Sequence, residues 1–596
     1  MAKMLKVEFP YLNKSIEVPE GTKLSQACAD AGYPLNLVCG GRGVCKKCGV
    51  DIEEDGEVKR VLSCQVVVYD GIKVLLREEE QKVQILTSST MDQTAHNPSI
   101  HSLHFTREQL FTELGDNDWS TLRNLTDKKI QKPELEILQK ISKTYHHESG
   151  LRLIMNHCEI LDVMPGDDER TVYGIAFDLG TTSAVGYLYD MEDGRIVGVS
   201  STMNKQTELG GDVISRINHV VTEPDKYGPR LQKLAVDTLN EIITDICDSH
   251  KIDIVDIYMA VVVGNSTMQH LLLGLYPEYL GKKPFSSTIH SVYETSAKHI
   301  GLKMCPTGKF AILPLLGGFV GADTTAVLLS IPNDNKVRLM LDLGTNGEIA
   351  VGKDTNYNVS STACGPALEG AGLSHGMRGT NGAIERVAIV DGKLEYKVIG
   401  NTKPEGVCGS GVIDLVAEMY KNEVINELGT FNDPEDMVSP DLKKRIRKEG
   451  HENVFVVAFA EETSIGTDIF FSQNDVRQVQ MAKAAIYTGC VMVVEDYGIK
   501  GEDLTEIVIA GAFGNYIDVH HAQSIGMIPK YEGVPVRSLG NAAGTGSQLY
   551  LISKEKQQEC RVLGREAIFV ELANKPGFME QYTGNMNFGD SWEGED

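Results

Sequence analysis

Four cysteines near the N-terminus have the types and spacing needed to hold an iron–sulfur cluster. Cys39, Cys45, Cys48 and Cys64 follow the pattern C-x5-C-x2-C-x15-C, and the loop between the first two is rich in glycine. Three thiolates on such a loop and a fourth from a neighbouring segment suit a [2Fe–2S] cluster. Glycine lets the backbone curl and turn its amide groups toward the cluster sulfurs. Zinc more often takes two C-x2-C pairs, so the spacing predicts a one-electron centre.

A second chemically suited group occurs twice. The tetrapeptide Asp-Leu-Gly-Thr stands at 178–181 and again at 342–345, each time between two apolar runs. In such a strand–turn–strand unit, the glycine lets backbone amides approach a phosphate oxygen, and the threonine hydroxyls add neutral donors. Two facing copies would hold a triphosphate, with the aspartates near Mg²⁺ or the attacking water. The predicted residues of the two turns are Asp178, Gly180, Thr181, Thr182, Asp342, Gly344, Thr345 and Asn346.

Two further turns of small residues fit a nucleotide site. An apolar run at 506–510 leads into Gly-Ala-Phe-Gly, which would let adenine and ribose approach the backbone. Cys-Gly-Ser-Gly at 408–411 opens a helical pattern at 412–420, and an ordinary tight turn explains it equally well. Asp212, Asp323 and Glu369 are candidates for a general base, with helix capping or a solvated face as the alternative. The predicted contacts in the two turns are Gly409, Ser410, Gly411, Gly511, Ala512, Phe513 and Gly514.

Composition restricts the class of protein. A chain of 596 residues should form three or four domains of about 150 residues each. Its net charge of −26 argues against nucleic acid as a partner. No apolar run reaches the ~18 residues of a membrane span. Twelve cysteines without a secretion signal predict a cytoplasmic protein. The phosphate loop G-x-x-x-x-G-K-[ST] is absent, which excludes a P-loop ATPase.

The elements around these motifs predict a multidomain chain of α/β and α+β type. Alternating runs at 5–9 and 14–18, a helix at 23–31 and strands at 47–53 and 73–76 resemble a β-grasp ferredoxin. We predict that this [2Fe–2S] domain spans 1–85, followed by a polar linker at 86–104. A small α+β middle domain at 105–170 contains helices at 107–114 and 133–143 and a strand at 151–163. Two related lobes form the remainder, 171–596.

The order of the motifs, with a phosphate turn, a second phosphate turn and an adenosine turn, resembles the ASKHA superfamily of actin, Hsp70 and sugar kinases. Joined to a two-iron domain, the whole chain resembles the reductive activators of corrinoid proteins. Further segments that carry the resemblance are Asn204-Lys-Gln206, the stretch 210–217, Val263–Met268 and Leu316–Asp323.

This resemblance implies ATP- and Mg²⁺-dependent reduction of inactive Co(II) to Co(I) on a corrinoid protein of a methyltransferase system. It also implies a low-potential donor such as ferredoxin or flavodoxin, and a homodimer, with no nucleic acid and no membrane involved.

Three alternatives stay open at this point. The chain could be an ATP-dependent electron donor of the 2-hydroxyacyl-CoA dehydratase activator type, although those proteins bridge a four-iron cluster between subunits. It could be a small-molecule kinase with a redox-sensing cluster, which would phosphorylate a substrate. An actin-like assembly protein would form filaments with nucleotide and would have no use for the cysteines.

Overall fold

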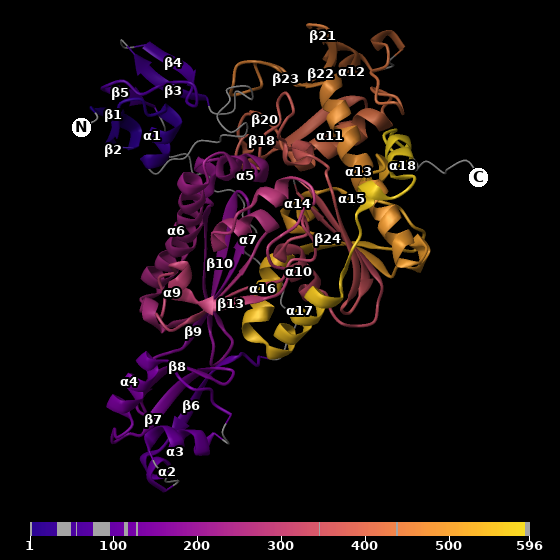
Figure 1. The fold of residues 1–596 in the computed structure, drawn as a ribbon. Coiled ribbons are helices and arrows are strands. Elements are labelled where there is room, and N and C mark those ends of the chain that lie inside the picture. The colour runs from indigo at the N-terminus through magenta and orange to yellow at the C-terminus, as the bar shows by residue number, and fades with distance from the viewer. Residues whose placement is uncertain are drawn as a thin grey trace.

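The computed structural model describes residues 3–12, 14–31, 49–54, 57–75, 96–112, 117–126, 129–344, 346–436 and 439–589. Cys39, Cys45, Cys48 and Thr345 lie outside these residues, as do residues 86–95 of the predicted linker. Figure 1 shows two accessory domains at opposite ends of a large two-lobed body. No helix in the described part of the chain combines the length and the apolar character needed to cross a lipid bilayer.

The N-terminal domain is a five-stranded sheet with one helix packed on it. The strand order is β2-β1-β5-β3-β4, and β1 pairs parallel with β5 and antiparallel with β2. Apolar side chains of the sheet and the helix form its own small core. The predicted strands and helix are confirmed, and β4 adds a strand that the sequence pattern did not indicate. The elements are β1 (Met4–Phe9), β2 (Lys14–Pro19), α1 (Leu24–Asp30), β3 (Gly49–Glu54), β4 (Glu57–Leu62) and β5 (Ile72–Val74).

The middle domain is a three-stranded antiparallel sheet, β6-β7-β8, with three helices. Its first strand occupies 100–105, so the last residues of the predicted linker belong to this domain. The single strand predicted at 151–163 is a hairpin, because His157 takes a left-handed conformation (φ 51°) and turns the chain. The elements are β6 (Ile100–Phe105), α2 (Arg107–Thr112), α3 (Asp118–Leu125), α4 (Leu135–Thr144), β7 (Leu151–Asn156) and β8 (Glu159–Pro165).

The two lobes repeat one topology. The first sheet has the order β11-β10-β9-β12-β14-β13 and the second has β17-β16-β15-β24-β25 with β26 at its edge. In each sheet, the first three strands form antiparallel pairs. The next two strands run parallel to the third strand, which is β9 in the first lobe and β15 in the second. Helices α10 and α16 pack against each other between the sheets, where Val261 of the first lobe and Met340 of the second join one core. The prediction of two related lobes is confirmed.

The bounds of the first lobe are as follows. Its elements are β9 (Tyr173–Leu179), β10 (Ser183–Asp190), β11 (Ile196–Met203), η2 (Lys205–Glu208), α5 (Val213–Thr222), α6 (Pro224–His250), β12 (Ile257–Val263), α7 (Ser266–Leu273), α8 (Glu278–Gly281), β13 (Tyr293–Ser296), α9 (Ala297–Ile300), β14 (Lys309–Ile312), α10 (Ala322–Ser330), α16 (Ala542–Ile552) and α17 (Lys554–Glu566).

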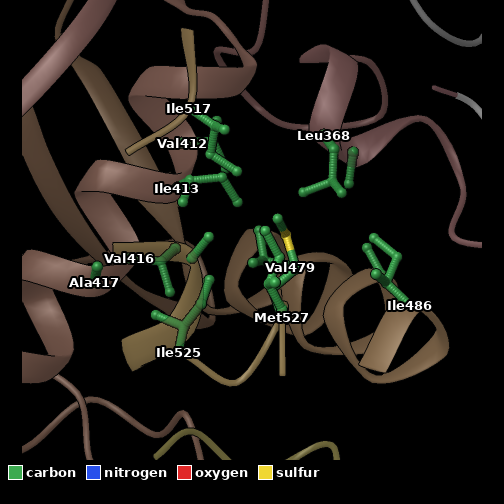
Figure 2. Packing of buried hydrophobic residues seen from close by; sticks show 14 of the residues in the cluster. Leu368, Val412, Ile413, Val416, Ala417, Val479, Ile486, Ile517, Ile525 and Met527 are labelled. Carbon is green, nitrogen blue, oxygen red and sulfur yellow. The ribbon is translucent and has the colours of Figure 1, made fainter. Parts of the chain in front are cut away.

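The second lobe carries an additional layer of helices and small sheets. Figure 2 shows Val412, Ile413 and Val416 of α11 gathered with Val479 of α13 and Met527, which follows α15. The elements are β15 (Arg338–Leu343), β16 (Gly347–Lys353), β17 (Asn356–Thr362), η4 (Pro366–Glu369), β18 (Ala383–Val390), β19 (Lys393–Val398), β20 (Gly406–Val407), α11 (Gly409–Lys421), α12 (Pro440–Arg445), β21 (Ile446–Glu449), β22 (Glu452–Ala458), β23 (Ile469–Ser472), α13 (Gln473–Tyr497), β24 (Glu506–Ala510), α14 (Gly511–Tyr516), α15 (Val519–Ser524), β25 (Val536–Gly540), β26 (Ile568–Phe569) and α18 (Phe578–Gly584).

Candidate functional site

The first phosphate turn joins β9 to β10 and is held from several directions. The Gly180 amide donates to the Ser183 carbonyl at 2.9 Å, which closes the turn. Asn204 Nδ2 donates to the Gly180 carbonyl at 2.8 Å. Asn265 Nδ2, at the N-cap of α7, donates to Thr181 Oγ1 at 2.9 Å. Because that oxygen accepts from Asn265, the Thr181 hydroxyl proton can be donated to a phosphate oxygen.

The second phosphate turn joins β15 to β16 and closes in the same way. The Gly344 amide donates to the Asn346 carbonyl at 2.9 Å. Gly511, the first residue of the predicted adenosine turn, lies against it, since a Cβ placed there would be 2.9 Å from Asp342 Oδ1. Gly511 also has a φ of +82°, so a side chain is disfavoured there on two grounds. The predicted adenosine turn and the second predicted phosphate turn are therefore in contact at Gly511 and Asp342.

Carboxylates from both lobes interact where the lobes meet. Burial, followed by the charge of Asp323, raises the pKa of Asp178 to about 7. Burial and the charges of Asp323 and Asp178 raise the pKa of Asp342 to about 7. The pKa of Asp323, in the first turn of α10, is raised to about 6 by burial, and that of Glu348 is raised well above its usual range. Such mutually repelling carboxylates suit a site for a cation.

The fit of a magnesium ion can be judged from the donor set. Among the described residues, no three carboxylate, histidine or cysteine side chains converge closely enough to ligate a metal together. Mg²⁺ is usually held by one or two carboxylates together with phosphate oxygens and water. Asp178 and Asp342 could supply such a pair of carboxylates to a magnesium–nucleotide complex.

One arginine links the two lobes directly at the first turn. Arg378 Nη2, from the second lobe, donates to Thr182 Oγ1 at 3.3 Å. Burial lowers the pKa of Arg378, while the charge of Glu369 acts in the opposite sense. A cation enclosed beside a turn of amide and hydroxyl groups is suited to a phosphate oxyanion.

The Cys-Gly-Ser-Gly turn has a clear packing role. Ser410 Oγ donates to the Glu385 carbonyl at 2.9 Å. A Cβ on Gly411 would lie 2.3 Å from the Ile384 carbonyl oxygen, so glycine lets α11 pack closely against β18. Gly409 opens the helix, and all three residues are buried. A contact of Gly409, Ser410 or Gly411 with nucleotide stays a prediction.

The other candidates take varied positions. Asp212 caps α5 by accepting from the Ser215 amide at 2.8 Å, which is the structural alternative named for it. Glu369 lies beside the second phosphate turn, with its Oε1 3.4 Å from where a Gly344 Cβ would be. Gly514, in α14, packs against Ile509 of β24. The backbone of α14 includes Ala512 and Phe513, whose side chains lie outside the described residues.

A histidine connects α15 to α11, the helix that begins at the Cys-Gly-Ser-Gly turn. His521 of α15 lies with Nδ1 2.8 Å from Asp414 Oδ1 and Nε2 3.2 Å from Glu418 Oε1, both on α11. Both carboxylates are buried, and Asp414 also lies 3.6 Å from the Arg386 guanidinium. The hydrogen bond and charge of Asp414 raise the pKa of His521.

We expect His521→Gln to destabilise the second lobe in a pH-dependent manner. A histidine with a raised folded-state pKa stabilises fully below its unfolded pKa, and this stabilisation is lost as pH rises through the folded value. The loss should be about 1–2 kcal/mol at pH 6, because the ring stays partly exposed, and smaller at pH 9. Calorimetric unfolding at the two pH values measures it.

The adjacent His520 provides the matched control, because its side chain is exposed. His520→Gln should leave the unfolding profile unchanged at both pH values. An equal effect of His521→Gln at pH 6 and pH 9 would show that its charge contributes nothing.

Of the four predicted cluster ligands, the structure describes Cys64, which follows β4. It is 4% exposed, and Gln65 Nε2 lies 3.3 Å from its sulfur. The neighbouring Ser63 hydroxyl is buried and has no hydrogen-bond partner among the described residues. A buried hydroxyl beside a buried thiol fits a site where cluster sulfur would accept the missing bond.

Sequence reasoning did not identify three residues of the site. Asn265 lies in a segment that carried the resemblance, but its contact with Thr181 was not anticipated. Glu348 follows the second turn, where strand alternation from Asp342 through the hairpin could have indicated a facing carboxylate. Arg378 lies in a glycine-rich loop of the second lobe, and nothing in its local sequence indicates a contact with Thr182.

The fold and the site together define the class of protein: a two-lobed ASKHA-type ATP-binding unit joined to a [2Fe–2S] ferredoxin-like domain. Family models agree with this division. Residues 5–79 match the 2Fe-2S iron-sulfur cluster binding domain, 173–335 the RACo middle region, and 336–593 the C-terminal domain of RACo, the ASKHA domain. The boundary between the last two lies between α10 of the first lobe and β15 of the second, and the last match also includes α16 and α17 of the first lobe.

Similar known proteins narrow the class further, two of them over nearly the whole chain. The corrinoid activation enzyme RamQ of Eubacterium limosum is 48% identical over 98% of this chain and 100% of its own. The solved structure of a reductive activator for corrinoid, iron-sulfur protein has a TM-score of 0.71 and 28% identity, covering 98% of both chains. The [Co(II) methylated amine-specific corrinoid protein] reductase of Methanosarcina barkeri is 24% identical over 60% of this chain and 66% of its own. The chain belongs to the RACo family of corrinoid activation enzymes.

Proposed function

We propose that this protein is an ATP-dependent reductase that returns the cobalt of a corrinoid protein from inactive Co(II) to Co(I). The supporting observation is the presence, in one chain that matches a corrinoid activation enzyme end to end, of a cluster domain and a two-lobed nucleotide unit. Cys39, Cys45, Cys48 and Cys64 would hold a [2Fe–2S] cluster, which would supply one electron.

The nucleotide unit would bind ATP through groups already held in position. The Gly180 and Gly344 turns present backbone amides, and Thr181 and Thr182 present hydroxyls kept in place by Asn265 and Arg378. Asp178 and Asp342 would hold Mg²⁺ and orient the attacking water from opposite lobes. Because one residue set comes from each lobe, closure of the lobes assembles the site and hydrolysis releases it.

ATP is needed because the electron transfer is unfavourable. A plant-type cluster has a potential near about −400 mV, and each ~59 mV uphill costs a factor of ten for one electron. Nucleotide-driven movement of the lobes can change how the corrinoid protein is bound and thereby make its Co(II) easier to reduce. The protein's role is thus to couple lobe closure to the partner's state.

The proposed reaction also requires an electron donor and a reducing environment. A low-potential ferredoxin or flavodoxin would reduce the cluster, and the active species would be a homodimer. The buried cysteines Cys247, Cys490 and Cys560 are reduced thiols, which suits a reducing cytoplasm.

The test mixes reduced protein, MgATP and a Co(II) corrinoid protein and follows the cobalt absorbance. Co(I) should accumulate with ATP and should not accumulate with ADP or without nucleotide. ATP should be hydrolysed to ADP and phosphate with no phosphorylated small molecule formed. Equal reduction with and without ATP, or none in either case, would refute the proposal.

A further inference from the structure

The ferredoxin-like domain contacts the first lobe through α1. Gln26 Nε2 donates to Glu208 Oε1 at 3.0 Å. Glu208 is the last residue of η2, a short helix between β11 and α5, and it also forms an ion pair with Arg230 of α6. The arginine fixes the carboxylate, so Gln26 meets an acceptor that is already oriented. Figure 1 shows α1 on the side of the domain nearest α5 and α6.

On its other side, α1 supports the segment that carries a cluster ligand. The Leu24 amide donates to the Val66 carbonyl at 2.9 Å, and the Ser25 amide donates to the Ser63 carbonyl at 3.1 Å. These bonds bracket Cys64. A displacement of α1 therefore moves the Cys64 segment with it.

Helix η2 is in turn attached to the first phosphate turn. Its N-cap residue is Asn204, which is fully buried and whose Oδ1 accepts from the Gln206 amide at 3.0 Å. The Asn204 amide donates to the Thr182 carbonyl and Nδ2 to the Gly180 carbonyl, both at 2.8 Å. One asparagine thus starts η2 and holds both ends of the turn.

Arg216 makes the attachment of η2 to the first phosphate turn sensitive to a nearby negative charge. Its side chain is fully buried, and burial lowers its pKa to about 9. Nη1 donates to Gln206 Oε1 of η2 at 3.2 Å, and Nη2 donates to the Thr181 carbonyl. A phosphate bound at the turn would attract this guanidinium and tighten its hold on both elements.

We propose that η2 is a docking surface for the ferredoxin-like domain, and that nucleotide at the first phosphate turn strengthens this docking through Asn204 and Arg216. Two sites coupled in this way affect each other equally, so loss of docking should weaken nucleotide binding by the same factor. The inference rests on the proposed nucleotide site and adds a route by which its occupancy positions the cluster domain.

The test uses full-length protein and a non-hydrolysable ATP analogue with Mg²⁺. Amide hydrogen exchange in 24–30 and 205–208 should slow when the analogue binds. Gln26→Glu places a negative charge against Glu208 and should abolish the response of 24–30. The same variant should weaken analogue binding about fivefold or more by calorimetry.

A double variant in which the two side chains trade places provides the control. Gln26→Glu combined with Glu208→Gln restores a donor and an acceptor, and both the response and the affinity should recover. Glu20→Gln changes a charge at an exposed position of the same domain and should have no effect. Analogue binding that leaves exchange at 24–30 unchanged or faster would overturn this inference alone, whereas absence of nucleotide binding would overturn the proposed function.

Discussion

Replacing Cys64 by serine should abolish Co(I) formation while ATP binding and hydrolysis stay within about twofold of the unchanged protein. The reason is that a hydroxyl is a much poorer ligand than a thiolate for an iron–sulfur cluster. The cysteine is buried in the ferredoxin-like domain, whose core is separate from those of the lobes. Iron and sulfide content and visible absorption measure the cluster. The ATP-dependent cobalt assay measures Co(I) formation.

Cys158→Ser is the matched control for this change. Cys158 lies at the β7–β8 turn of the middle domain and is partly exposed. The variant should keep the cluster and the full rate of cobalt reduction. Retention of a normal cluster and of Co(I) formation in Cys64→Ser would remove Cys64 from the ligand set.

The second large effect is expected from Asp342→Asn. Removing a carboxylate that orients water and metal should slow ATP hydrolysis by about 100-fold to 1,000-fold, the range found when one electrostatic group is removed from an active site. Co(I) formation should fall in parallel, because it depends on the same cycle. Phosphate release and calorimetric titration with MgATP measure the two effects separately.

The stability of Asp342→Asn distinguishes lost chemistry from misfolding. Because burial and neighbouring carboxylates raise the pKa of Asp342 to about 7, against about 3.9 in the unfolded chain, this residue costs stability progressively as pH rises from about 4 to 7, and the cost is complete above pH 7. Relative to the unchanged protein, the melting temperature of the variant should therefore rise most at pH 8 and by a smaller amount at pH 5. Asp193→Asn, in the exposed β10–β11 turn, should change neither hydrolysis nor melting. Undiminished hydrolysis in Asp342→Asn would contradict the assigned role.

Local signals account for what the sequence could predict. The β9–β10 and β15–β16 hairpins are continuous in the chain, so their repeated tetrapeptide indicated both turns and both lobes. The cysteine spacing similarly indicated the class of the first domain, which the family match confirms. Strand β4 was missed although the dipeptide Asp55-Gly56, typical of a hairpin turn, precedes it, because charged residues interrupt the apolar alternation at 57–62.

Contacts between distant segments were beyond local patterns. Thr182 and Arg378 are 196 positions apart, and Gln26 and Glu208 are 182 apart. Whether Thr182 and Arg378 meet is decided by how the two lobes pack around α10 and α16. Short sequence motifs carry no information about this packing. The same holds for Asp323, whose proximity to Asp178 and Asp342 follows from where α10 crosses between the sheets.

The attachment of Asn97 has a mechanical consequence. Its amide donates to the Ile552 carbonyl at 2.9 Å, and its carbonyl accepts from the Lys554 amide at 2.9 Å. These partners are where α16 ends and α17 begins, next to the helices that lie between the two sheets. The chain between the ferredoxin-like domain and the middle domain is therefore attached, at Asn97, beside the helices that lie between the two sheets. If the lobes rotate about these helices, this point of attachment would move little. The position of the ferredoxin-like domain would then be set by its contact with η2 and not by the chain that follows the domain.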